Sequence, residues 1–148
     1  MLARPLGIRI GLEYMAWTYP SDPLGAIEIA GRSGCVIVVD LLHHTRVGAG
    51  PDELEAIVAS DLLGWVQLCD AGPAPALDRL VDEARHRRLA PGTGTLALRS
   101  LLDHLPNDVT VSVEVQSDDL LRLGPRERAR LLHDAATTVL GHSPNSTG

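Results

Sequence analysis

The stretch VIVVDLLHH, residues 36–44, joins a run of apolar, β-branched residues to an acid and two histidines. A continuous apolar run of this kind is typical of a strand in a parallel sheet, where both faces are covered. Asp40 ends the run, and His43 follows three residues later. Because acidic side chains are seldom buried without a partner, the position of Asp40 indicates that the end of this strand carries a polar function.

Three further apolar runs end in the same way. They are IRIGLEY (8–14) with Glu13, WVQLCD (65–70) with Gln67 and Asp70, and VTVSVEV (109–115) with Glu114. Stretches with helical periodicity lie between the runs and after the last one, whereas LLHHTRVGAG (41–50) is predicted to be a loop. Strands that alternate with helices predict an α/β fold with a parallel sheet and right-handed crossovers.

The polar strand ends are regularly spaced. Glu13, Asp40 and Gln67 follow one another at intervals of 27 residues, and Glu114 comes later because residues 71–97 insert an extra loop and helix. Parallel strands place their carboxyl ends at one edge of the sheet, where α/β folds build sites. Carboxylate and amide oxygens suit Mg²⁺ or Mn²⁺, whereas three histidines or thiolates would favour zinc. One such residue often marks only the point where the chain reaches solvent, but four at one edge favour a site.

The histidines and glycines near these ends allow more than one interpretation. His43 is placed to point back over its strand end, and the other histidines are predicted to lie on surface helices or loops: His44, His86, His104, His133 and His142. The glycines of the turn PGTG (91–94) could present backbone amides to a phosphate. A plain tight turn is the favoured interpretation of the same residues.

Composition narrows the class of partner and the compartment. The net charge is −6 at pH 7 and the sequence pI is about 5.4, which argues against nucleic acid or an anionic membrane as the partner. Cys35 and Cys69 lie in apolar runs, and the start of the chain lacks the pattern of a signal peptide. No apolar run reaches the length of a membrane span. We therefore expect a cytoplasmic protein with free thiols.

In this order and spacing, the motifs resemble the C-terminal half of the xylose-isomerase-like TIM barrels, the sugar phosphate isomerase/epimerase group. The motifs that carry the resemblance are LE at Glu13, VDLLH with Asp40 and His43, WVQLCDA with Gln67 and Asp70, RLAPGTGTL (88–96), and VSVEV with Glu114. The likeness covers nearly all of residues 7–140. With Gln67 in place of a histidine, this strand resembles that of the hydroxypyruvate-isomerase-like branch. The turn that follows reads PGxGE in that branch, but here it reads PGTGT and lacks the glutamate.

The resemblance implies roles for particular residues. The metal ligands would be Glu13, Asp40, Gln67 and Glu114, with Mn²⁺ or Mg²⁺, or else Co²⁺, as the cofactor. The two glutamates, Glu13 and Glu114, would be the catalytic acid–base pair. His43 would contact the substrate, as would an arginine before the turn, for which Arg88 is the best match and Arg85 and Arg87 are competitors.

Length separates this chain from a complete member of that group. A full barrel has eight strands and about 250 residues, whereas these 148 residues supply four strands. We expect one domain over residues 1–141, a parallel (βα)4 unit that corresponds to the C-terminal half of a TIM (β/α)8 barrel, and a disordered tail over residues 142–148. The chain is then a fragment, a half that pairs with a second copy or with a separate N-terminal half, or an open sheet that stands alone.

The expected activity follows from the resemblance. It is that of a sugar or sugar phosphate isomerase or epimerase, which moves a proton next to the carbonyl of a small hydroxy-carbonyl substrate. One alternative is a lyase of the same fold, similar to 3-dehydroshikimate dehydratase, which uses the metal and the acid–base groups for dehydration. Another is a non-catalytic half-barrel that associates with a partner through its open sheet edges.

Overall fold

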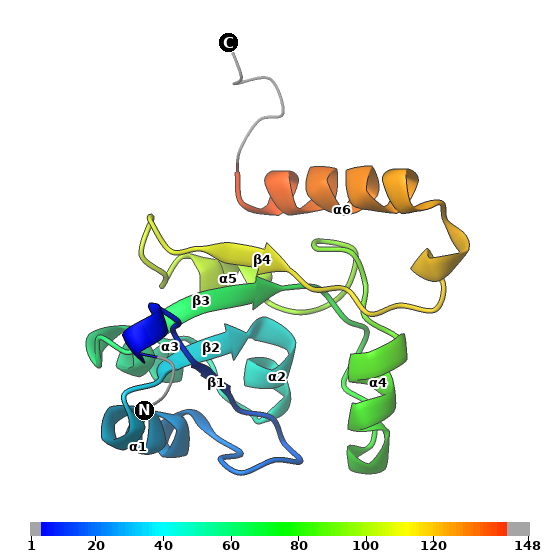
Figure 1. The fold of residues 1–148 in the computed structure, drawn as a ribbon. Helices are drawn as coiled ribbons and strands as arrows, with labels where there is room; N and C mark the ends of the chain where they lie inside the picture. Colours follow the sequence, from blue (N-terminus) through cyan, green and yellow to red (C-terminus); the bar gives the residue numbers. More distant parts are fainter. Residues whose placement is uncertain (1–3, 142–148) are drawn as a thin grey trace.

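A single parallel sheet organises the computed structural model, which describes residues 4–141. Its four strands are hydrogen-bonded in chain order: β1 (Gly11–Glu13), β2 (Val36–Asp40), β3 (Leu63–Leu68) and β4 (Val111–Val113). The strands in Figure 1 point the same way, so their carboxyl ends meet at one edge. The predicted parallel (βα)4 sheet is confirmed, while the tail predicted over residues 142–148 lies outside the described residues.

The helices fall into two groups by position. Those that cover the outer face of the sheet are α1 (Pro23–Ser33), α3 (Pro51–Ala59), α5 (Leu98–Leu102) and α6 (Pro125–Val139), and those beside the carboxyl ends of the strands are α2 (Leu41–Arg46) and α4 (Leu80–His86) (Figure 1). Three short 3₁₀ segments complete the chain: η1 (Arg4–Leu6), η2 (Leu77–Arg79) and η3 (Leu120–Arg122). Within residues 4–141, no helix has the length and apolar character needed to cross a bilayer.

The main hydrophobic core lies between the sheet and the first group of helices. Alternate strand residues, among them Ile37, Val39 and Val66, are fully buried there. They pack against small residues of α1 and against Leu54 of α3 and Leu101 of α5. Since side chains alternate between the two faces of a strand, the residues between these point to the opposite, concave face.

The indole ring of Trp65 covers part of the concave face. A Cβ atom at Gly11 would lie 2.5 Å from Cγ2 of Val38 and 2.6 Å from Cη2 of Trp65. The indole of Trp65 therefore lies across Gly11 and Val38, in space that only a glycine leaves free. Each of these residues is followed two positions later by a predicted site residue, so the polar side chains lie on this same face.

Most element boundaries follow local signals in the sequence. α1 starts with Asp22 as its N-cap, which accepts a hydrogen bond from the Gly25 amide at 2.9 Å, and with Pro23 in the first turn. It ends at Gly34, whose φ of 71° belongs to the left-handed region that glycine enters without strain.

One predicted loop is wrong. Residues 41–46, predicted to be part of a loop, form helix α2. The cause is Asp40, which is both the last residue of β2 and the N-cap of α2: its Oδ1 accepts hydrogen bonds from the amides of Leu42 at 2.8 Å and His43 at 3.3 Å. The strand thus runs directly into a helix, and His43 is held one turn from Asp40.

Candidate metal and acid–base site

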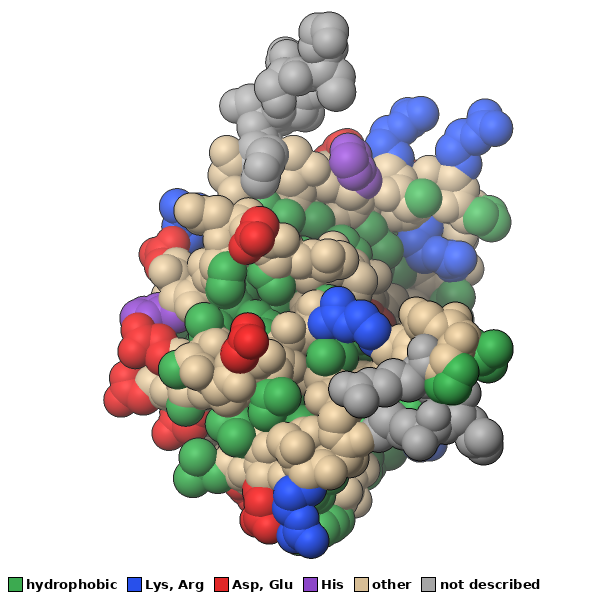
Figure 2. All heavy atoms as spheres, turned by 60° about the vertical axis from the view of Figure 1, so that its left-hand side comes forward, with side chains coloured by type: hydrophobic (Ala, Val, Ile, Leu, Met, Phe, Trp, Pro, Cys, Tyr) green, Lys and Arg blue, Asp and Glu red, His purple; other side chains and the backbone are tan. Residues whose placement is uncertain are grey.

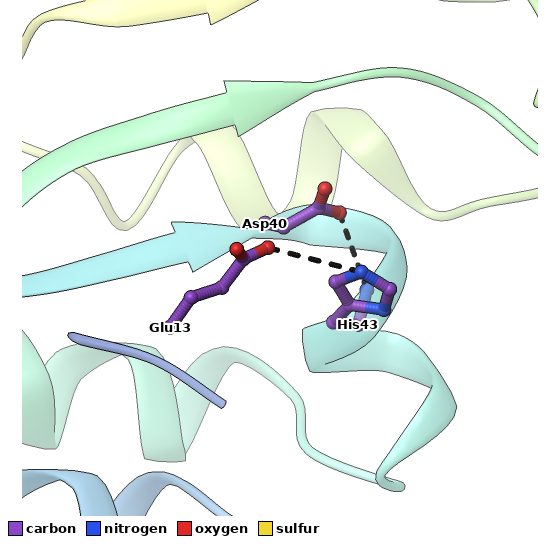
Figure 3. A group of neighbouring side chains, drawn as sticks. All are labelled: Glu13, Asp40 and His43. Carbon is purple, nitrogen blue, oxygen red and sulfur yellow. Dashed lines mark hydrogen bonds and ion pairs between the residues drawn. The ribbon is translucent and has the colours of Figure 1, made fainter. Parts of the chain in front are cut away.

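The carboxyl edge of the sheet brings the predicted site residues together. Glu13 from β1, Asp40 from β2 and His43 from α2 each offer a ligand atom, and these atoms lie within 4.8 Å of one another (Figure 3). Gln67 is paired with Asp40 in the register of β2 and β3. Its Nε2 donates a hydrogen bond to the carboxylate of Glu114, the residue directly after β4. All four strands therefore contribute to one polar cluster.

Arg88 lies at the centre of the cluster although it comes from the long connection after β3. Its side chain is almost completely buried, and its Nη1 donates to Oδ2 of Asp40 at 2.5 Å. Its Nε donates to the Ala84 carbonyl at 2.7 Å, which fixes the guanidinium from behind. The competing candidates Arg85 and Arg87 are exposed, so the structure brings only Arg88 among the three into the site.

The guanidinium of Arg88 also determines the protonation state of the His43 ring. Nη2 of Arg88 lies 3.3 Å from Nε2 of His43. Because a guanidinium can only donate, this contact requires Nε2 to be the unprotonated acceptor. Burial lowers the pKa of His43, and the nearby Arg88 lowers it too, against the opposing effect of Asp40. His43 is therefore a neutral imidazole with its lone pair directed into the cluster.

The pKa of the Glu13 carboxyl group is shifted toward neutrality. Burial and, to a smaller extent, the negative charges of Asp40 and Glu114 together raise the pKa of Glu13 to about 7, against the opposing effect of Arg88. Oε1 of Glu13 lies 3.8 Å from Nε2 of His43 (Figure 3). A carboxyl group with a pKa near neutrality exchanges protons readily at physiological pH.

The residues present fit a divalent cation. Three carboxylates face a single guanidinium, so the cluster has an excess of negative charge that a cation would offset. The buried Oε1 of Gln67 has no hydrogen-bond partner in residues 4–141, and a buried carbonyl oxygen without a partner is costly. Carboxylate, amide and imidazole donors suit several divalent metals, so the donor set alone does not choose among them.

Comparison with known proteins assigns the fold family. A family model described as xylose isomerase-like TIM barrel matches residues 1–137. The chain belongs to this family. The comparison with curated proteins gives no match.

Solved structures of xylose isomerase-like proteins share the fold at low sequence identity. The structure of IolI, described with a bound zinc atom, superposes with a TM-score of 0.82 at 20% identity and covers 95% of this chain and 51% of IolI. A xylose isomerase domain protein from Alicyclobacillus acidocaldarius gives 0.69 at 24%, over 93% of this chain and 52% of its own. A xylose isomerase domain-containing protein from Salmonella typhimurium LT2 gives 0.71 at 16%, over 94% and 54%. The chain spans about half the length of these structures.

Behind the site, this xylose isomerase-like chain has a buried pair that sequence reasoning missed. His44, predicted to lie on the surface, is fully buried. Its Nδ1 lies 2.6 Å from the hydroxyl of Tyr14, and its Nε2 lies 2.8 Å from the Gly50 carbonyl. The carbonyl can only accept, so Nε2 carries the proton and Tyr14 donates to Nδ1. The pair ties the residue after Glu13 to the residue after His43. The two adjacent histidines in the sequence were the only signal of this pair. Predicting it would have required placing them on a helix, which directs their side chains to different sides.

The turn at residues 91–94 is not a phosphate cradle. The amides of Gly92, Gly94 and Leu96 donate to the carboxylate of Asp70 at 2.9 to 3.1 Å, and the Ala71 amide donates at 2.8 Å. A side-chain anion of the chain itself thus occupies the position that a phosphate would take. The plain structural turn, which the sequence favoured, is the arrangement observed, and it supports the segment that carries Arg88.

Trp17 forms the apolar side of the site. Its ring meets that of His43 edge to face, with centroids 5.1 Å apart and an angle of 87° between the planes. The residue is 37% exposed, whereas His43 is buried. Trp17 therefore shields the imidazole from solvent and presents an apolar surface beside the polar cluster.

Proposed function

We propose that this chain carries the metal-binding and acid–base half of a sugar isomerase- or epimerase-like site, which transfers a proton next to the carbonyl of a small hydroxy-carbonyl substrate. The observation that carries the proposal is the cluster in which ligand atoms of Glu13, Asp40 and His43 lie within 4.8 Å of one another, and in which the pKa of Glu13 is raised to about 7. A group with this pKa acts as a base and, once protonated, as an acid at the same pH. Membership of the xylose isomerase-like family supports the assignment.

In the proposed reaction, the carboxylate of Glu13 accepts the proton from the carbon next to the substrate carbonyl. The electron pair of the broken C–H bond moves toward the carbonyl oxygen and leaves an enediolate. Glu114, which follows the opposite outer strand, would begin the cycle protonated and would return its proton to the other face of that carbon or to the neighbouring carbon. The first outcome is an epimerisation, and the second is an isomerisation.

Two further side chains orient the substrate oxygens. Arg88 keeps a charged guanidinium in the buried cluster because Asp40 raises its pKa, outweighing the effect of burial, which lowers it. His43 stays neutral, so its Nε2 accepts a hydrogen bond in the cluster without adding charge. A charged donor and a neutral imidazole together suit a hydroxyl group beside a carbonyl.

The divalent cation of the proposed site would be held by Glu13, Asp40, Gln67 and Glu114, with His43 adjacent. When bound, such a cation polarises a carbonyl or hydroxyl group as a Lewis acid. Mn²⁺ and Mg²⁺ are the ions proposed on the oxygen-rich donor set. The free thiols Cys35 and Cys69 accord with a cytoplasmic location, which we propose with the function.

Hydrogen exchange tests the proposed chemistry without knowledge of the natural substrate. The chain is incubated in D₂O with Mn²⁺ and a panel of ketoses and aldoses, and deuterium at the carbon next to the carbonyl is measured by mass spectrometry. We expect incorporation by the parent and its loss in Glu13→Gln, with Glu28→Gln, at an exposed glutamate of α1, as the matched control. Incorporation that is equal in the parent and Glu13→Gln contradicts the role of Glu13.

Product analysis separates isomerase from lyase chemistry. The same preparation is given dehydroshikimate, and loss of water is followed by absorbance. Dehydration of dehydroshikimate without exchange on any sugar would replace the isomerase proposal with the lyase alternative. Exchange on sugars without dehydration supports the proposal as stated.

A further inference from the structure

Both edges of the sheet are open in residues 4–141. β1 and β4 are the outer strands, and each pairs with one neighbour only. Large apolar side chains are exposed along both: Ile8 (56%) and Ile10 (43%) just before β1, and Val113 (39%) in β4. Unpaired strand edges with exposed apolar side chains are templates for pairing with another chain.

The concave face is open as well. The helices α1, α3, α5 and α6 contribute to the core on the outer face. The concave face has Trp65, only half-buried, lying across Gly11 and Val38. In an eight-stranded barrel this face is the interior, which is filled by side chains from all eight strands. The candidate site at its carboxyl end is therefore incomplete until a second sheet covers it.

We propose that a second copy of this chain closes the sheet into an eight-stranded barrel, in which β4 of each copy pairs with β1 of the other. A two-fold axis along the barrel keeps all strands pointing the same way, so both new pairings are parallel, like the three pairings within the chain. The inference goes beyond the proposed function and does not depend on it.

The register of the sheet fits this closure. Glu13 pairs with Val38, two residues before Asp40. Asp40 pairs with Gln67, whose own partner Ser112 lies two residues before Glu114. From β1 to β4, the site residues are therefore offset along the strand direction by four residues in total. This is half of the shear of eight that closes an eight-stranded barrel. If β4 of one copy pairs with β1 of the other so that Glu114 lies opposite Glu13, this junction adds no further offset between strands. Two copies together then reach the shear of eight.

The charges at the amino end of the strands complement each other in this arrangement. Arg9 precedes β1 and Asp108 precedes β4, both are exposed, and both line a hollow at this end of the sheet. Neither has an ion-pair partner in the described part of the chain. In the proposed register, Arg9 of one copy lies opposite Thr110 of the other and diagonal to its Asp108, within reach of a long side chain. Figure 2 shows this end of the molecule, where acidic and basic side chains surround apolar patches.

The mass of the chain in solution is the first test. Light scattering coupled to size exclusion is run on the purified chain from low to high micromolar concentration. We expect a species of twice the chain mass of 15.8 kDa, in equilibrium with the monomer at the lowest concentrations. A monomer at every concentration overturns the proposal.

Exchange of charges between copies tests the junction itself. Arg9→Asp alone sets two acids against each other at both junctions, and Asp108→Arg alone sets two arginines against each other. Each variant is expected to dimerise about tenfold more weakly than the parent, because a favourable pair becomes a repulsive one twice in each dimer. A mixture of the two variants restores an Asp–Arg pair at both junctions, so we expect the mixture to dimerise like the parent.

Rescue by mixing cannot arise from contacts within one chain, because each variant keeps its own altered charge. The matched controls are Arg85→Asp and Asp78→Arg, which reverse exposed charges away from both edges and should leave dimerisation unchanged. A dimer that neither Arg9→Asp nor Asp108→Arg weakens overturns the proposed junction. Weakening without rescue in the mixture overturns it as well.

Discussion

Asp40 and Asp70 look alike in the sequence but have different surroundings. Both follow an apolar run, both lie at the carboxyl side of a strand, and both are 1% exposed. Asp70 accepts hydrogen bonds from four backbone amides. Asp40 accepts from two amides with one oxygen and from the Arg88 side chain with the other. The first carboxylate is held entirely by main chain, and the second shares its charge with a functional group.

This difference shows how a buried acid can be assigned to structure or to chemistry. Backbone amides occupy both oxygens of Asp70, so these oxygens are not available to a ligand. Asp40 lies among Glu13, His43 and Arg88, where the charges remain unbalanced. We therefore expect variants of Asp70 to change stability and variants of the Asp40 cluster to change metal binding.

The largest expected effect on stability is that of Asp70→Asn. The amide keeps one acceptor oxygen but turns an NH₂ group toward amides that previously donated to the carboxylate. Leaving two of the amides around this carboxylate unsatisfied should lower the free energy of unfolding by about 3 kcal/mol. Urea denaturation of the metal-free chain measures this, with Asp78→Asn as the exposed control, for which we expect a change within about 0.5 kcal/mol. Equal midpoints for the two variants would contradict the structural role of Asp70.

Gly94→Ala tests the same loop from its other side. A Cβ atom at Gly94 would overlap the Ala71 carbonyl oxygen and the Asp70 carboxylate, neither of which is free to move. We expect a loss of about 2 kcal/mol, typical of forced overpacking. Gly72→Ala is the control, because a Cβ atom at that position meets nothing within 4 Å. A fully stable Gly94→Ala chain would show that the loop is not clamped on Asp70.

A smaller effect, and one that depends on pH, is expected at Glu13. Its pKa is about 7 in the folded chain against an ordinary value of 4.5, so the folded state holds a proton that the unfolded state has lost between these values. Stability from this group therefore falls as pH rises from about 4.5 to about 7. Since its side chain is 29% exposed, solvent reduces the effect, and we expect Glu13→Gln to gain about 1 kcal/mol over the parent between pH 5.5 and pH 8.5.

The comparison of Glu13→Gln with the parent is essential here. His43 acts in the opposite sense, because its lowered pKa makes stability fall as pH drops below 6.5. Subtracting the two denaturation curves at each pH, in the presence of a chelator, isolates the contribution of Glu13. A difference that does not change with pH would contradict the raised pKa.

The sequence was sufficient to predict the strand order and the shared edge, because apolar runs and their spacing are local properties. It could not separate Asp40 from Asp70, since three of the four amides that bind Asp70 come from residues 92–96, more than 20 positions further on. It also missed α2, whose six residues are too few to show helical periodicity. Because these residues were predicted to be a loop, the burial of His44 was not predicted. Only a helix directs the adjacent side chains of His43 and His44 to different sides.

Binding of Mn²⁺, followed by the electron paramagnetic resonance signal of the free ion, tests the central assignment most directly. We expect the parent and Asp70→Asn, at a temperature where circular dichroism shows both folded, to bind Mn²⁺ with similar affinity. Asp40→Asn and Glu13→Gln should bind it at least about 100-fold more weakly, as expected for loss of a ligand. Parent-like binding by Asp40→Asn and Glu13→Gln, or loss of binding in Asp70→Asn alone, would contradict a metal site at the carboxyl edge of the sheet.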